Sequence, residues 1–176
     1  MASTPTPPNS VTVLGIDPGS RNLGWGVVHE GSGVVRLVAC GVIHPKGAEF
    51  SLRIGDLFRQ LHAVVSEYRP DEAAIENMFT HKNAMSALKL GQARGAAIAA
   101  CAACGVPVFD YEPTVIKKSL VGTGRAEKEQ VGFMVARILG VKAVDWSLDT
   151  SDALGCAICH LNTRRMMLLT GKGRIG

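Results

Sequence analysis

The sequence predicts a single α/β domain with a mixed five-stranded sheet and helices on both faces. Three apolar runs near the N-terminus are separated only by short turns, and the later runs alternate with stretches of helical periodicity. Short turns join antiparallel neighbours, whereas a helix between two strands makes them parallel. At 176 residues, 47% of them hydrophobic, the chain is long enough to bury one core.

The first three strands are expected at Val11–Asp17, Leu23–His29 and Val34–Ile43. Turn-forming residues separate them, Pro18–Asn22 after the first strand and Gly31–Gly33 after the second. These strands should therefore form an antiparallel set.

Alternating helices and strands follow. An apolar stripe predicts a helix from Ser51, as its N-cap, to Tyr68, where Pro70 stops it. Asn83 is expected to cap the next helix. In order, we predict helix 51–68, strand 71–76, helix 83–104, strand 106–111, and helices 113–120, 127–139 and 149–167. We expect residues 1–10 to be a disordered leader, 11–167 the domain and 168–176 a mobile basic tail.

Composition narrows the function only loosely. The net charge of +4 is compatible with nucleic acid as a partner but does not require it. Residues 1–10 have no basic start and no apolar core, so no signal peptide is predicted. The low-polarity run Gly95–Phe109 is too short and too rich in alanine to cross a bilayer. We therefore expect a cytoplasmic protein with no membrane partner.

Two CxxC pairs resemble a zinc site on paper. Cys101 and Cys104 form one pair, and Cys156 and Cys159 form the other. Both pairs lie in apolar runs with helical character, whereas zinc-binding pairs usually sit in turns. We interpret these cysteines as small buried hydrophobic residues.

Four acidic residues stand at positions that can converge. Asp17 and Glu76 each end an apolar run, and Asp149 and Asp152 stand three apart at a predicted helix start. The last residue of a buried strand lies at the sheet edge, and residues three apart share a helix face. Each also has an ordinary explanation. Asp17 could form a turn before Pro-Gly, Glu76 could be a surface carboxylate, and the aspartates could complement the helix dipole.

A cluster of four acids predicts that the site binds metal cations. Like charges raise each other's pKa, so four carboxylates are costly to gather without a counter-ion. Oxygen ligands favour Mg²⁺ or Mn²⁺ over zinc. Two such ions about 4 Å apart can activate a water and stabilise the leaving oxygen at a phosphate ester. In this arrangement Asp17 would bridge both ions.

Several motifs together resemble the RuvC family of bacterial Holliday junction resolvases. They are Gly15–Gly26 (GIDPGSRNLGWG), Ala74–Phe79 (AIENMF), Ala87–Gly95 (ALKLGQARG), Val121–Lys128 (VGTGRAEK) and Asp149–Leu154 (DTSDAL). The resemblance runs from about residue 11 to residue 164, and ALKLGQARG is its most specific part.

The resemblance implies an RNase H-like fold whose catalytic carboxylates fall on Asp17, Glu76, Asp149 and Asp152. It implies a homodimer that cuts two like-polarity strands of a four-way DNA junction at a short T-containing sequence, alongside the RuvA–RuvB branch-migration complex. Two Mg²⁺ ions per site are expected, with Mn²⁺ as a substitute.

Basic residues are candidates for contacts with DNA. Lys128 is also the cationic candidate for catalysis, because it resembles a family lysine near the scissile phosphate, and Lys117 resembles another. A phosphate-tracking face is predicted from five nearby cations, namely Lys117, Lys118, Arg125, Lys128 and Arg137. The alternative is that these are solvated side chains on amphipathic helices.

The segment after Glu76 supplies a further candidate. Phe79, followed closely by His81 and Lys82, could stack on an unpaired base, and the family uses an aromatic residue here. The alternative is a core phenylalanine. His160 lies eleven residues after Asp149, about 16 Å along a straight helix, so we interpret it as structural.

Two other classes of protein remain as alternatives. Actin-like nucleotide-binding proteins also open with Asp-x-Gly, but this chain is short for two lobes. A non-catalytic DNA-binding module is the second alternative, although four acids facing DNA would repel phosphates. The small residues around Gly91 and Gly95 allow close packing, either on the chain's own sheet or on a second subunit.

Overall fold

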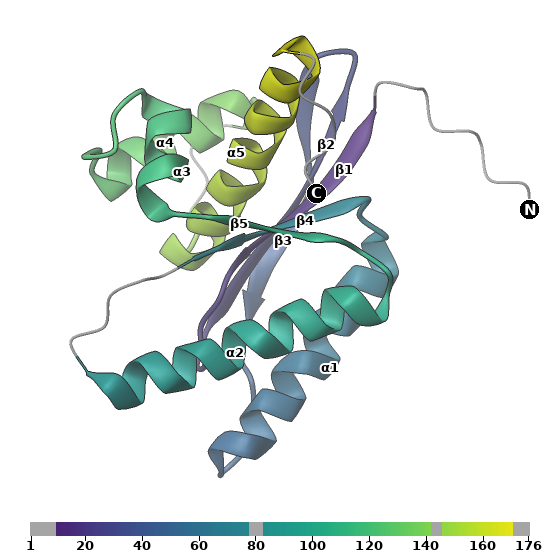
Figure 1. Cartoon of the computed structure of the whole chain (residues 1–176), viewed down its shortest axis with the longest axis vertical. Coiled ribbons are helices and arrows are strands. Elements are labelled where there is room, and N and C mark those ends of the chain that lie inside the picture. The colour runs from purple at the N-terminus through teal and green to yellow at the C-terminus, as the bar shows by residue number, and fades with distance from the viewer. Residues whose placement is uncertain (1–9, 78–82, 142–145, 171–176) are drawn as a thin grey trace, which may run out of the picture.

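The computed structural model describes residues 10–77, 83–141 and 146–170. The elements in chain order are β1 (Val11–Asp17), β2 (Leu23–Gly31), β3 (Val34–Ile43), α1 (Phe50–Tyr68), β4 (Glu72–Glu76), α2 (Ala84–Ala103), β5 (Val108–Tyr111), α3 (Pro113–Val121), α4 (Lys128–Ile138) and α5 (Leu148–Thr170). The sheet runs through the middle of the molecule with helices on either side (Figure 1).

The sheet has the predicted mixed topology. Its strand order is β3-β2-β1-β4-β5. The β1–β2 and β2–β3 pairs are antiparallel, while β1–β4 and β4–β5 are parallel. β1 is therefore the central strand, and most of its side chains are buried. The C-terminal ends of β1 and β4 lie side by side because the two strands are parallel neighbours.

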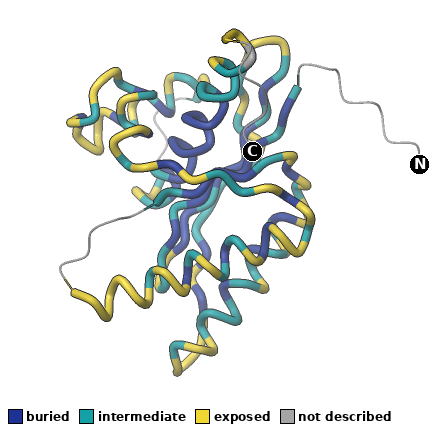
Figure 2. Tube along the Cα trace, viewed as in Figure 1, coloured by how far each residue is buried: buried dark blue, intermediate teal, exposed yellow. Residues whose placement is uncertain are grey.

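The two faces of the sheet carry different helices. α3, α4 and α5 cover one face, and α1 and α2 cover the other (Figure 1). Alternating side chains of β1 supply both cores, since Val13 faces the first layer and Leu14 the second. The most deeply buried segments are the inner strands and the middle of α5 (Figure 2).

Some element boundaries differ from the prediction. α1 begins at Phe50 with Glu49 as its N-cap residue, so the expected cap at Ser51 is wrong. β5 begins at Val108 rather than Val106, because Pro107 has no N–H for the ladder and the Val106 amide bonds to Cys101 at the end of α2. α5 continues to Thr170, past the expected end at residue 167.

Other local predictions are confirmed. The Asn83 side chain accepts a hydrogen bond from the Met85 amide at 2.9 Å and so caps α2. Gly105 follows the helix with a φ of 74°, the left-handed conformation that glycine favours after a helix. Of the CxxC residues, Cys101, Cys156 and Cys159 are buried within α2 and α5. None of the described helices is long and apolar enough to cross a membrane.

Candidate active site

The four predicted acids line one cavity at the C-terminal ends of β1 and β4. Asp17 ends β1 and Glu76 ends β4, and the first turns of α5 bring Asp149 and Asp152 to the same place. The cavity has a volume of about 610 Å³. Its lining residues are Asp17, Pro18, Gly19, Ser20, Arg21, Asn22, Glu76, Pro113, Ile116, Lys117, Lys128, Val131, Asp149 and Asp152. Three distant stretches of chain therefore meet as the sequence predicted.

The start of α5 explains where its two aspartates point. The Ser147 hydroxyl accepts a hydrogen bond from the Thr150 amide at 3.2 Å, which satisfies a free donor of the first turn. Thr150 and Ser151 are buried against the protein, at 4% and 8% exposure. Asp149 and Asp152 flank them and share the face directed into the cavity.

Electrostatics set the protonation of the site. Burial, together with the charges of Glu76, Asp152 and Asp149, raises the pKa of Asp17 from 3.8 to about 8. Burial and the Asp152 charge also raise the pKa of Glu76. Asp17 and Glu76 hydrogen-bond to each other through their side chains, which requires a proton on one of them. Binding of a cation would therefore compete with this proton.

A lysine stands among the acids. Lys128 is the first residue of α4, and its Nζ lies 3.3 Å from Asp152 Oδ2. The Asp152 charge raises the pKa of Lys128, so its ammonium stays protonated. Glu127 and Gln130 form a reciprocal capping box that fixes the start of α4 and hence the base of this lysine. Lys117 lines the cavity from α3.

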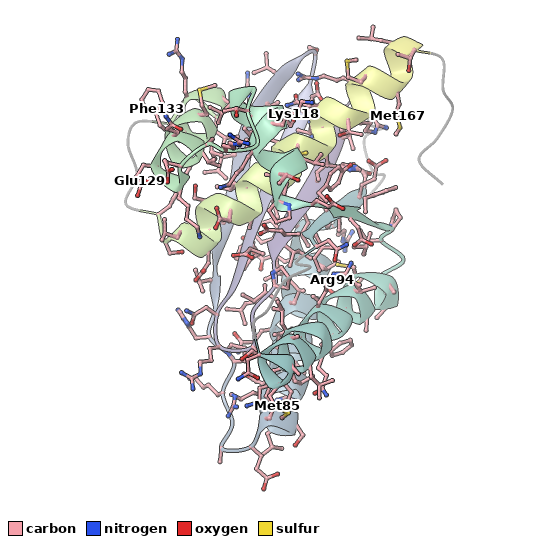
Figure 3. The ribbon with its side chains drawn as sticks, turned by 60° about the vertical axis from the view of Figure 1, so that its left-hand side comes forward. Met85, Arg94, Lys118, Glu129, Phe133 and Met167 are labelled. Carbon is pink, nitrogen blue, oxygen red and sulfur yellow. The ribbon has the colours of Figure 1, made fainter. Side chains whose placement is uncertain are left out.

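Two further predicted DNA contacts, Lys118 and Arg125, do not line the cavity. Lys118 is exposed on α3 (Figure 3), and Arg125 is exposed in the loop between α3 and α4. Phe79, His81 and Lys82 lie outside the described residues.

Two residues that line the cavity were not predicted from the sequence as part of the site. Arg21 and Asn22 line it from the turn after β1, and the Asn22 Oδ1 atom lies 3.0 Å from His44 Nδ1. Arg21 is exposed and makes no hydrogen bond or ion pair with any other residue in the described ranges. The sequence assigns both residues to a turn and to the motif that begins at Gly15, but it gives neither a role in the site.

The donor set suits a hard divalent cation. Four carboxylates in one cavity, with no sulfur ligand among its lining residues, favour oxygen-seeking ions. Within residues 10–77, 83–141 and 146–170, however, no three potential ligands are already grouped to hold a metal. Binding would need side-chain adjustment, including release of Asp152 by Lys128 and of the hydrogen bond between Asp17 and Glu76.

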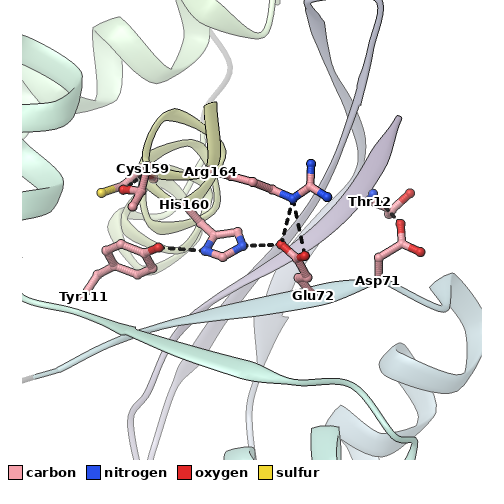
Figure 4. Close-up of polar contacts among 8 residues, drawn as sticks. Thr12, Asp71, Glu72, Tyr111, Cys159, His160 and Arg164 are labelled. Carbon is pink, nitrogen blue, oxygen red and sulfur yellow. Dashed lines mark hydrogen bonds and ion pairs between the residues drawn. The ribbon is translucent and has the colours of Figure 1, made fainter. Parts of the chain in front are cut away.

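A second polar cluster ties α5 to the sheet away from the cavity (Figure 4). His160 is fully buried, with Nδ1 2.7 Å from the Tyr111 hydroxyl and Nε2 2.6 Å from Glu72 Oε2. Arg164 also contacts Glu72, and the Phe109 ring lies 4.7 Å from the His160 ring. The His160 hydrogen bond and the Arg164 charge lower the pKa of Glu72. These contacts link α5 to β4 and β5, which agrees with the structural role predicted for His160.

The fold and the cavity together define a class of protein, an RNase H-like domain with carboxylates clustered at the end of its central strands. The family model described as crossover junction endodeoxyribonuclease RuvC matches residues 13–160. The RuvC of Nitratidesulfovibrio vulgaris is 65% identical over 162 residues, covering 92% of this chain and 97% of that one. The chain therefore belongs to the RuvC family of crossover junction endodeoxyribonucleases.

Solved structures agree with this assignment. Thermus thermophilus RuvC in complex with a Holliday junction substrate superposes with a TM-score of 0.83 at 37% identity, covering 89% of this chain and 96% of that chain. The yeast mitochondrial Holliday junction resolvase shares the fold alone, with a TM-score of 0.67 at 14% identity over 89% of this chain and 80% of that chain. The predicted fold and nuclease class are confirmed, and the actin-like and non-catalytic alternatives are not supported.

Proposed function

We propose that this chain resolves four-way DNA junctions by hydrolysing phosphodiester bonds at the carboxylate cavity. The observation that carries the proposal is the convergence of Asp17, Glu76, Asp149 and Asp152 in one cavity that also contains Lys128 and Lys117. Acids alone would repel DNA, whereas acids that hold cations next to two lysines can bind a phosphate. The family match supplies the substrate class.

Divalent cations are the cofactor that these residues fit. We propose two Mg²⁺ ions, with Mn²⁺ as a substitute, held by the four carboxylates. Bound there, the ions would activate a water and stabilise the leaving oxygen. Asp17 is the natural shared ligand because it lies on the central strand, between Glu76 on β4 and the two aspartates of α5.

The chain's own cations would orient the DNA. Lys128 forms an ion pair with Asp152 in the absence of substrate, and it is placed to contact a phosphate that enters the cavity. Lys117 is the second lysine of the cavity, and the exposed Lys118 and Arg125 are proposed to contact flanking phosphates. Phe79, His81 and Lys82 remain proposed contacts on the strength of the sequence resemblance, with Phe79 stacking on a base at the crossover.

The active form is proposed to be a homodimer, since two symmetric cuts call for two sites related by a two-fold axis. The start of α2 is the surface proposed for this contact. Met85 and Leu88 are 59% and 55% exposed there, and a side chain added at Gly91 would meet open space. Met85 lies at the N-terminal end of α2 (Figure 3). The RuvA–RuvB complex is proposed as the partner assembly.

A synthetic four-way junction tests the function. Each of its four strands is labelled separately, and the chain is added with Mg²⁺. We expect paired nicks at symmetric positions in two strands of like polarity, and no cleavage of a linear duplex of the same sequence. Cleavage of duplex and junction at equal rates, or nicks without symmetry, would overturn the proposal.

A further inference from the structure

The first turn of α5 lies unusually deep on the sheet. Gly24 of β2 pairs directly with Asp17 in the β1–β2 ladder. A methyl group added at Gly24 would overlap the backbone carbonyl carbon and oxygen of Asp149. Gly15 of β1 meets the Ala153 carbonyl group in the same way one turn later. The helix backbone therefore rests directly on the sheet backbone under the site.

A hydrogen bond fastens this turn to the third strand. The hydroxyl of Thr150 donates to the Gly41 carbonyl oxygen of β3 at 3.3 Å. The same hydroxyl lies 2.9 Å from the Ser147 hydroxyl, from which it can accept a bond. Thr150 is only 4% exposed and lies between Asp149 and Asp152 in sequence. A buried hydroxyl without partners would be costly, so this pair of bonds defines how the turn sits on the sheet.

We propose that Gly24 and Thr150 are positioning residues for the proposed metal site. Gly24 sets how closely the Asp149 backbone approaches Asp17, and Thr150 holds the turn at that depth. The inference rests on the proposed role of the four carboxylates. It adds that their spacing depends on a backbone contact and on one hydroxyl, neither of which touches a cation or DNA.

The expected effects follow from how little displacement of its ligands a metal site tolerates. Ligand positions must hold to within a few tenths of an ångström. A methyl group at Gly24 would force the Asp149 backbone away by roughly 1 Å or more before ordinary contact is restored. Loss of the Thr150 hydroxyl removes one hydrogen bond and leaves the shape of the side chain unchanged. The glycine change should therefore have the larger effect.

The test measures Mn²⁺ binding to the DNA-free full chain by calorimetry, with unfolding midpoints recorded for every variant. We expect Thr150→Val to weaken Mn²⁺ binding by about five-fold, the ordinary size of one net hydrogen bond, and Gly24→Ala to weaken it by about ten-fold or more. Junction binding measured in chelator should stay within about two-fold of wild type, because neither residue contacts DNA.

Thr12→Val is the matched control. The Thr12 hydroxyl also bonds across two elements, 3.0 Å from His29 Nδ1, but at the opposite end of β1 from Asp17. It should lower stability about as much as Thr150→Val with no change in Mn²⁺ affinity. Gly26→Ala controls for the glycine, since its methyl group would meet the Leu154 side chain rather than helix backbone.

Clear results would overturn the inference. Wild-type Mn²⁺ affinity in Thr150→Val would do so, as would equal loss of affinity in Thr12→Val, which would show a general effect of lowered stability. Thr150→Val decides the matter if Gly24→Ala does not fold. The proposed metal site fails separately if the wild-type chain and Asp17→Asn bind Mn²⁺ equally.

Discussion

The two helical layers meet the sheet in different ways. Side chains such as Leu57, Leu61 and Val65 fill the space between the sheet and the α1/α2 layer. On the other face the backbone of α5 contacts glycines of β1 and β2, and polar bonds run from Thr150 and His160 to the strands. We therefore expect the α1/α2 layer to tolerate side-chain changes better than the contact of α5 with the sheet, where backbone meets backbone. The acids of the cavity lie at the ends of β1 and β4 and on α5, which is the helix whose backbone contacts the sheet.

The largest expected effect comes from removing the shared carboxylate. Asp17→Asn should lower junction cleavage by ~10³-fold or more, because the central ligand of the proposed cations is lost. Junction binding should persist, since the lysines are unchanged. Gel-shift and single-turnover cleavage assays measure the two quantities. Glu67→Gln, an exposed change on α1, is the control, and wild-type cleavage by Asp17→Asn would refute the assignment.

A side chain shortened in the α1/α2 core should lower stability without changing cleavage. Leu61 is fully buried between α1 and the sheet, so Leu61→Ala should lower the free energy of unfolding by about 2–5 kcal/mol. Urea unfolding measures this loss. Cleavage at a temperature where the variant is folded should match the parent. If its metal requirement also rose, the contrast between the two layers would be wrong.

Disruption of the buried histidine cluster should cost nearly as much. His160→Ala removes the partner of the Tyr111 hydroxyl, leaves Glu72 with Arg164 alone and opens a cavity, so we expect a loss of about 2–4 kcal/mol. Tyr111→Phe removes only one hydroxyl and should cost about 1 kcal/mol. Urea unfolding of both variants gives the comparison. Equal losses would show that the Glu72 contact contributes little.

The raised pKa of Asp17 predicts a pH dependence with a definite sign. Since the folded pKa of about 8 exceeds the ordinary value of 3.8, the folded chain binds this proton more tightly than the unfolded chain. Ionisation therefore destabilises the fold as pH rises from about 4 to 8. In chelator, the stability of Asp17→Asn relative to the parent should therefore increase by several kcal/mol as the pH rises from 5 to 8.5. A pH-independent difference would contradict this.

The smallest expected effect concerns Arg21, in the turn after β1. Arg21 lines the cavity and forms no ion pair with the described part of the chain, so it is available to a phosphate. Arg21→Gln should weaken junction binding a few-fold and lower the slope of log affinity against log salt by about 0.9. Arg36→Gln, on the exposed edge of β3, is the control. An unchanged slope would remove Arg21 from the interface.

The fold and the four acids could be predicted because each depends on local pattern. Asp17 and Glu76 end apolar runs, and parallel neighbours must place such ends together. The bond from Thr150 to Gly41 could not be predicted, because it joins residues 109 positions apart through tertiary packing. The position of Arg21 in the cavity could not be predicted either, because the sequence around it indicates only a turn. The late start of β5 follows from Pro107, which the run of apolar residues concealed.

Crystals soaked in Mn²⁺ and measured at an anomalous wavelength would show where the cations bind. We predict two peaks inside the cavity, both next to Asp17, one shared with Glu76 and the other with the aspartates of α5. Peaks confined to other surfaces, with the four carboxylates free of metal, would contradict the proposed site.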